Sequence, residues 1–335
     1  MAMITSEDLL REISSEFLLT YRRQVGRHVL LPNLMRLGMP STLRTERYGY
    51  WESTPTLDRW DRNNDIPEDE LLSRSYSVVN LDWAKLIGFH ENDVDDVQLN
   101  GFKERARQLA GRARKLPQDV MFQMVTAGTN ARLLKSIPNA PDGAALYATT
   151  AGGSARFGVT GGNVLTGGGV TGAQIRSDFW QAMERFRLFQ DTEGEELLDD
   201  EIDQGVTIVY NASLEEQFHE AFLQDRTVAV VQNVAASENV AAAAPTNTAG
   251  ERMRAGLTVN LWPTQKITDN DWTITLNSEL VPRPMFQQVR MAPRTWEDNR
   301  ANSMKARHTK RQGIAIDARF GFGINLPYGS ILVNN

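Results

Sequence analysis

The stretch GGNVLTGGGVTGAQ, residues 161–174, has glycines at a spacing that could support chemistry. Gly167, Gly169 and Gly172 fit the pattern G-x-G-x-x-G, directly before a helical run. In dinucleotide-binding folds, the backbone N–H groups of such a turn hold a pyrophosphate at the N-terminus of the next helix. That fold needs a buried strand before the turn, and here no apolar run is longer than Val164-Leu165. The pattern therefore favours a flexible loop, with a nucleotide-binding enzyme as the alternative.

Other residue patterns that support catalysis are incomplete in this sequence. The nucleophile elbow G-x-S-x-G fails because Arg156 stands in place of the second glycine. The four histidines are too far apart in the sequence for a local metal motif. Asp93, Asp95 and Asp96 lack the rest of an EF-hand loop, and acidic residues before a helix are favoured by its positive N-terminal end. The sequence therefore predicts no enzyme, no cofactor and no metal site.

The composition is that of a packed protein without disulfides, because the 335 residues include no cysteine. The formal net charge of −6 disfavours a dedicated nucleic-acid-binding protein with a basic isoelectric point. No apolar run reaches the ~20 residues of a membrane span, and the acidic N-terminus does not fit a signal peptide. We therefore expect a protein that is made and used inside a cell and has no membrane partner.

The elements predicted for the N-terminal half expose apolar surface that needs a partner. An amphipathic helix is predicted at residues 6–24. Its apolar face consists of Leu9, Leu10, Ile13, Phe17 and Tyr21. Residues 47–89 predict two long strands joined by a charged excursion, a hairpin with too little core to be stable alone. Residues 98–128 predict a long basic helix in which Pro117 causes a kink or starts a second helix.

The C-terminal half mixes helices and strands without strict alternation, which favours the α+β class. A helix is predicted at residues 174–190, with Ile175, Phe179, Met183 and Phe186 buried. Strands are predicted at GVTIVYN (205–211), LTVNLW, DWTITLN and 313–326. The last strand alternates large apolar residues on one face, as a half-buried strand does.

The order of these parts resembles a tailed-phage major capsid protein of the Hong Kong 97 fold, and more specifically the Mu-like major head subunit family. The segments that carry the resemblance are ERYGYWESTPTLDRW, SYSVVNLDWAKLIGFHENDVDDVQLNGF, VTIVYNASLEEQFHEAF and DARFGFGINLPYGSILV. The similarity spans about residues 46–335 and rests on the order of segments rather than on a catalytic motif. The glycine-rich stretch 152–172 departs from the family.

The resemblance implies an α+β fold of the Hong Kong 97 type with five successive parts. These are an N-terminal arm (1–46), an extended E-loop hairpin (47–97), a spine helix that opens the peripheral domain (98–150), a mainly axial domain with the glycine-rich loop (151–290) and a return to the peripheral domain (291–335). The first helix would dock between subunits, and the hairpin would lie across a neighbouring subunit. The glycines would supply a pliable loop.

The resemblance also implies self-assembly into hexamers and pentamers of an icosahedral shell around double-stranded DNA. The protein would reside in the virion capsid after assembly in the host cytoplasm. Portal and scaffold proteins would be partners, a cement or decoration protein an optional one, and DNA would be bound without sequence preference. The predicted assembly interface is Trp51, Arg59, Trp60, Asp61, Asp199, Asp200, Lys305, Arg307 and Lys310. The predicted DNA-facing residues are Arg105, Arg107, Arg112 and Arg114.

Overall fold

The fold is that of a computed structural model, which describes residues 6–23, 31–51, 73–90, 99–126, 137–198, 200–223, 257–298 and 303–335. The chain divides into two compact units, each built from separate stretches of sequence. Unit 1 consists of Met1–Tyr48, Tyr76–Pro138 and Met285–Gly323, and unit 2 of Gly49–Ser75, Asn139–Pro284 and Ile324–Asn335. Among the described helices, none is long and apolar enough to cross a membrane.

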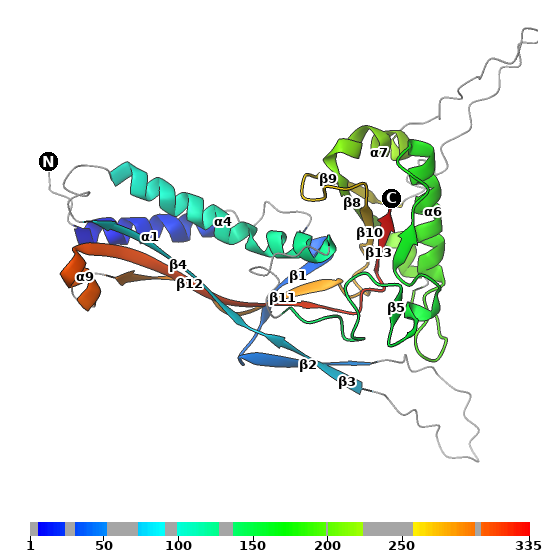
Figure 1. Ribbon diagram of the computed structural model, residues 1–335, viewed down its shortest axis with the longest axis horizontal. Helices are drawn as coiled ribbons and strands as arrows, with labels where there is room; N and C mark the ends of the chain where they lie inside the picture. Colours follow the sequence, from blue (N-terminus) through cyan, green and yellow to red (C-terminus); the bar gives the residue numbers. More distant parts are fainter. Residues whose placement is uncertain are drawn as a thin grey trace, which may run out of the picture. The chain divides into compact units, whose positions relative to one another are not determined.

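Unit 1 is built on a four-stranded sheet with the order β1-β11-β12-β4. Its elements are α1 (Ser6–Arg23), α2 (Leu31–Leu34), β1 (Met35–Pro40), β4 (Leu81–His90), α4 (Leu99–Val125), β11 (Met285–Asp298), α9 (Met304–Thr309) and β12 (Arg311–Ile324) (Figure 1). Strand β1 is parallel to β11, and β4 is antiparallel to β12. A separate two-stranded ribbon, β2 (Thr45–Trp51) with β3 (Ser73–Val79), forms the base of the predicted hairpin.

One face of the unit 1 sheet is covered by α1 and α4, which lie side by side (Figure 1). The cluster between them contains Leu10, Ile13 and Phe17 of α1, Phe102, Ala106 and Ala110 of α4, Phe89 of β4, and Ile314 and Ile316 of β12. The ion pairs Glu12–Lys103 and Glu16–Arg107 join the two helices at 2.6 and 2.7 Å. The apolar face of α1 is thus buried within its own subunit, and docking of this helix between subunits stays a prediction.

Two predicted elements have different limits in the structure. Helix α4 continues through Pro117 as one helix, so the proline does not start a second one. The second predicted strand is divided at Asn80, because β3 pairs with β2 while β4 pairs with β12. The pairing runs from Leu81 opposite Phe320 to His90 opposite Arg311, and it places Phe89 against the helices. The hairpin is therefore shorter than the sequence suggests.

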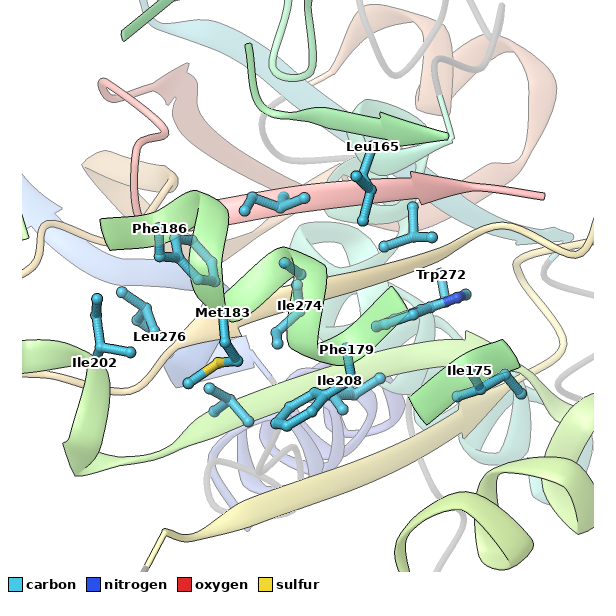
Figure 2. Close-up of a cluster of buried hydrophobic side chains, with 14 of the residues drawn as sticks. Leu165, Ile175, Phe179, Met183, Phe186, Ile202, Ile208, Trp272, Ile274 and Leu276 are labelled. Carbon is cyan, nitrogen blue, oxygen red and sulfur yellow. The ribbon is translucent and has the colours of Figure 1, made fainter. Parts of the chain in front are cut away.

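Unit 2 is built on a five-stranded sheet with the order β7-β13-β10-β8-β9. Its elements are β5 (Thr150–Ala151), β6 (Ser154–Ala155), η1 (Arg156–Gly158), β7 (Val164–Thr166), α6 (Gly172–Arg187), η2 (Asp200–Gln204), β8 (Val206–Asn211), η3 (Ala212–Leu214), α7 (Glu215–Phe222), β9 (Val259–Thr264), β10 (Trp272–Leu276) and β13 (Ser330–Asn334). The core in Figure 2 joins α6 to this sheet. The predicted stripe of Ile175, Phe179, Met183 and Phe186 on α6 is confirmed as fully buried.

The borders between the units differ from the boundaries expected at 150 and 290. The chain passes into unit 2 after Pro138 and back into unit 1 at Met285. The final strand β13 belongs to the sheet of unit 2, where Ile331 and Val333 fill the core. The expected single return at 291–335 is therefore shared between both units.

The glycine-rich stretch is packed closely, which corrects the expectation of a pliable loop. Gly162 has a φ of 54°, and a Cβ there would lie 2.3 Å from the carbonyl oxygen of Ala148. Only glycine accepts that conformation with so close a neighbour. Asn163 and Arg156 beside it are almost fully buried. The glycines thus serve close approach of the backbone rather than freedom of movement.

Candidate assembly surfaces

The glycine turn before α6 has its backbone donors occupied by the protein itself. Thr171 is the N-cap of α6 and forms a reciprocal capping box with Gln174. The N–H of Gly168 donates to the Asp178 carboxylate at 3.0 Å, and the N–H of Gly169 donates to Asn335 Oδ1 at 3.1 Å. A pyrophosphate at this turn would compete with these acceptors and meet a carboxylate. The turn is therefore not arranged as a cofactor site, and the residues described contain no cluster of metal-ligating side chains.

The face of the unit 1 sheet opposite α1 and α4 is called the outer face below. It is formed by Asp82, Ala84, Leu86 and Gly88 of β4, by Gly313, Ala315, Asp317 and Arg319 of β12, and by Arg290, Ala292, Arg294 and Trp296 of β11. The ion pairs Arg294–Asp317 and Arg319–Asp82 connect the strands across it. Alternation along each strand places these residues on one side, away from the helices.

Two large apolar side chains stand exposed on the outer face. Leu86 is 50% exposed and Trp296 is 52% exposed, and Leu86 lies opposite Ala315 on the neighbouring strand. Exposed apolar groups gathered on one rigid face are typical of a surface that binds another protein. The outer face is therefore the first candidate assembly surface.

The base of the hairpin packs at the other end of the outer face. Tyr48 of β2 contacts Phe286 of β11 edge to face, with ring centroids 5.1 Å apart, and Tyr76 of β3 contacts the same ring at 6.3 Å. A Cβ at Gly323 of β12 would lie 2.5 Å from the Phe286 ring, so glycine is required there. We call this contact region the hairpin root.

Sequence reasoning missed the residues of the hairpin root. The signal was present in RFGFGI of β12, where Phe320 and Phe322 are buried and the intervening Gly321 and Gly323 occupy the outer face. A strand that alternates large apolar residues with glycine needs room for something on its glycine face.

The four arginines predicted to face DNA fall into two groups. Arg107 is paired with Glu16 and, at 3.7 Å, with Glu104. Arg114 is half-buried beside Tyr21. Burial raises the pKa of the Tyr21 phenol, and the positive charge of Arg114 acts in the opposite direction. Arg105 and Arg112 lie on the exposed side of α4 together with Lys115. Within the described part of the chain no ion pair is seen for Arg105, Arg112 and Lys115, which we call the basic stripe; the Arg105 guanidinium lies 5.9 Å from the centre of the Phe102 ring.

The remaining predicted interface residues are only partly covered by the structure. Arg59, Trp60, Asp61 and Asp199 lie outside the described residues, as do the side chains of Trp51, Asp200 and Lys305. Arg307 and Lys310 are exposed at the end of α9 and just after it.

The acidic stretch after α6 forms an ordered turn in unit 2. The N–H groups of Glu193 and Glu195 both donate to Asp191 Oδ1, at 2.9 and 3.0 Å. Glu193, Glu195 and Glu196 are all exposed. The turn therefore presents three carboxylates to solvent from a fixed backbone.

The model of one known protein family matches part of the chain. The family model described as Mu-like prophage major head subunit gpT matches residues 15–134, which include the second half of α1, the hairpin and α4. No curated protein matches the chain.

Three solved structures share the fold at low sequence identity. A chain from Microbacterium phage Oxtober96 is 11% identical with a TM-score of 0.52, over 91% of this chain and 90% of that one. A chain from the capsid of cyanophage P-SCSP1u is 8% identical with a TM-score of 0.52, over 91% and 88%. A chain from the capsid of Myoviridae phage XM1 is 9% identical with a TM-score of 0.50, over 91% and 90%. The chain therefore has the Hong Kong 97 fold of these phage capsid chains, and its residues 15–134 are similar to the Mu-like major head subunit family.

Proposed function

We propose that this protein is a major capsid protein that assembles into hexamers and pentamers of an icosahedral head enclosing double-stranded DNA. Its role is structural rather than catalytic. Unit 1 corresponds to the peripheral domain of the Hong Kong 97 fold, and unit 2 corresponds to the axial domain. Assembly takes place in the host cytoplasm, on a scaffold and around a portal, and a cement protein is an optional addition. The observation that carries the proposal is the hairpin, whose β2–β3 base is seated on unit 1 by aromatic contacts.

The hairpin suits a contact between subunits because of what joins its strands. The connecting residues 52–72 contain seven acidic and two basic residues and few large apolar ones. Such a segment gains little by packing on its own subunit. The outer face of a neighbour, with Leu86 and Trp296 exposed, offers the hairpin a surface to lie across. Contacts of this kind cover ~2,000 Å² or more in obligate assemblies.

Deletion of residues 58–70 tests this function. We expect the variant to fold, with a free energy of unfolding within about 1 kcal/mol of the original, because shortening a connection changes loop entropy only slightly. We expect no shells by electron microscopy. A variant with the same 13 residues replaced by a Gly/Ser linker controls for loop length, and it too should form no shells. Normal shells from either variant would contradict the assignment of the hairpin to assembly.

The basic stripe is proposed to contact the phosphates of packaged DNA without reading its sequence. Helical rise of ~1.5 Å per residue places Arg105 and Arg112 about 10 Å apart along one side of α4. We expect duplex binding by capsomers in the non-specific range, Kd ~10⁻⁴–10⁻⁶ M, with a steep dependence on salt. The double variant Arg105→Gln, Arg112→Gln should reduce the slope of log Kd against log salt by about 2.

The matched control is Arg107→Gln, because Arg107 is already neutralised by Glu16. Its salt slope should stay close to that of the original protein in anisotropy titrations with several unrelated duplexes. Nanomolar binding, or a preference for one duplex at physiological salt, would count against this role of the basic stripe.

The acidic and basic segments are proposed to meet in neighbouring subunits. The exposed carboxylates of Glu193, Glu195 and Glu196, together with Asp199 and Asp200 of the same acidic segment, would face Lys305, Arg307 and Lys310. Exposed pairs contribute only ~0–1 kcal/mol each, but every subunit repeats them. Charge reversal at Arg307 and Lys310 should lower the yield of shells, and this loss of yield should become smaller as salt is added. A yield that changes neither with the charge reversal nor with salt would refute the pairing.

A further inference from the structure

The hairpin root contains a chain of buried polar side chains that connects β2, β3 and β11. We infer that Gln288 of β11 is a positioning residue for assembly, because it fixes the direction in which the hairpin leaves unit 1. The inference rests on the proposed role of the hairpin. It goes beyond that role by naming which residues set the hairpin's direction.

Gln288 is fully buried, and each of its polar groups has a partner on the hairpin side. Its Oε1 accepts a hydrogen bond from Tyr48 Oη at 2.7 Å. Its Nε2 donates to the carbonyl oxygen of Val78 at 3.2 Å and to Asn80 Oδ1 at 3.1 Å. One amide from the sheet thus holds both strands of the hairpin, β2 through Tyr48 and β3 through Val78.

The orientation of this amide is set by its partners. The carbonyl of Val78 can only accept, so it requires the NH₂ of Gln288 on its side. The oxygen must then face Tyr48. Gly321 on the adjacent strand leaves the space, because a Cβ there would lie 2.4 Å from Gln288 Nε2. The side chain therefore has one arrangement that satisfies all its groups.

The chain of hydrogen bonds continues from Asn80 to the residues before β2. Asn80 Nδ2 donates to Ser41 Oγ at 2.6 Å and to the carbonyl oxygen of Leu43 at 2.8 Å. Ser41 Oγ donates in turn to Glu46 Oε1 at 2.9 Å. The same Glu46 oxygen accepts the N–H groups of Thr42 at 2.6 Å and of Leu43 at 2.8 Å.

The Glu46 carboxylate anchors the far end of this chain in its ionised form. The N–H of Leu43, the Ser41 hydroxyl and the N–H of Thr42 lower the pKa of Glu46, and the charge of Arg290 acts in the same direction. The turn that leads into β2 is therefore tied to the turn that follows β3. Both strands of the hairpin are fixed at their base.

A polar chain at this position suits a directional role better than a packing role. Apolar contacts are non-directional, so an aliphatic side chain would allow several orientations of the ribbon at similar energy. Buried hydrogen-bond networks that are fully satisfied rigidify a region and specify one arrangement. The aromatic contacts of Tyr48 and Tyr76 with Phe286 attach the hairpin, and the amide chain orients it.

The test compares Gln288→Leu with Gln287→Leu. Gln287 is the adjacent residue on β11, is 6% exposed, and by strand alternation its side chain lies on the other face of the sheet. Because the chain has no cysteine, spin labels can be placed at Arg47→Cys on β2 and Ala84→Cys on β4, both exposed. The distance distribution between the labels reports the direction of the hairpin in the unassembled subunit.

We expect Gln288→Leu to keep a cooperative unfolding transition but to broaden or shift the label distances. Shell yield should fall about tenfold, since the apparent affinity of each contact falls with the fraction of hairpins in the competent direction. Gln287→Leu should leave distances and yield unchanged. Tyr48→Phe, which keeps the ring and loses one hydrogen bond, should broaden the distances in the same sense and provides the test if Gln288→Leu does not fold.

Unchanged label distances in Gln288→Leu and in Tyr48→Phe would overturn the positioning role, as would a shell yield equal to that of Gln287→Leu. The label measurement needs no shell. If the unaltered protein formed no shells under any condition, the proposed function would fail while the distances still decided the role of Gln288.

Discussion

Replacing Phe179 with alanine will lower the free energy of unfolding by about 3–5 kcal/mol, the usual cost of removing a phenylalanine from a packed core. Phe179 is 1% exposed and joins α6 to α7, because its ring meets Phe222 edge to face at 5.1 Å. It belongs to the cluster in Figure 2, where helix and sheet share one core. The alanine variant should therefore lose the contact between the two helices and leave a cavity that the sheet cannot fill.

Urea unfolding followed by circular dichroism measures this effect. Leu280→Ala is the matched control, since it also removes a large apolar side chain from unit 2 but at a position 75% exposed. It should change the free energy of unfolding by less than about 0.5 kcal/mol. A cost below 1 kcal/mol for Phe179→Ala would mean that the α6–sheet core is not packed as described.

Replacing Arg156 with methionine will destabilise unit 2 by about 3 kcal/mol or more, because it breaks a buried ion pair and leaves its partner uncompensated. Arg156 is 1% exposed, and its Nε donates to Asp142 Oδ2 at 2.7 Å. Its Nη1 donates to the carbonyl oxygens of Ala145 and Leu146 and to Asn163 Oδ1, at 2.9, 3.0 and 3.0 Å. Burial lowers the pKa of Arg156, and the hydrogen bond to Asp142 opposes that shift.

The methionine variant keeps an unbranched side chain, which is shorter than arginine, and it removes all the hydrogen-bond donors. The carbonyl group of Ala145 would lose its Arg156 donor, which costs about 1–3 kcal/mol for a buried group, whereas the carbonyl of Leu146 would keep the hydrogen bond from Asn163 Nδ2 at 2.9 Å. Arg187→Met, at an exposed position at the end of α6, is the control and should be nearly neutral. If the two variants unfold at the same urea concentration, the buried arginine is not what holds the glycine-rich stretch.

The sequence predicted those parts of the fold that depend on local periodicity. The stripe of α6 and the alternation of Ile314, Ile316 and Phe320 in β12 are repeated within a few residues, so their buried faces could be read directly. The division of one expected strand at Asn80 could not, because it depends on β4 pairing with β12, more than 200 residues away. Register between distant strands leaves no local pattern in either strand.

The same distinction applies to the candidate site. Arg105 and Arg112 could be recognised as cations on a helix. The ion pair of Arg107 with Glu16 could not be predicted, because it depends on α1 lying beside α4. The burial of Arg156 could not be predicted from the sequence, because arginine is almost never fully buried without a partner. Its pairing with Asp142 could not be predicted either, because the two residues meet only through the fold of the segment between them.

The positions of β12 and β13 have a consequence for the chain as it leaves the ribosome. β12 lies between β11 and β4 in one sheet, and β13 lies between β7 and β10 in the other. Both strands are translated after the strands they pair with. Neither sheet can therefore be completed before the ribosome has passed Arg311. A product of premature termination before that point would lack an internal strand in each of the two sheets. The order of the strands thus couples completion of translation to completion of both sheets.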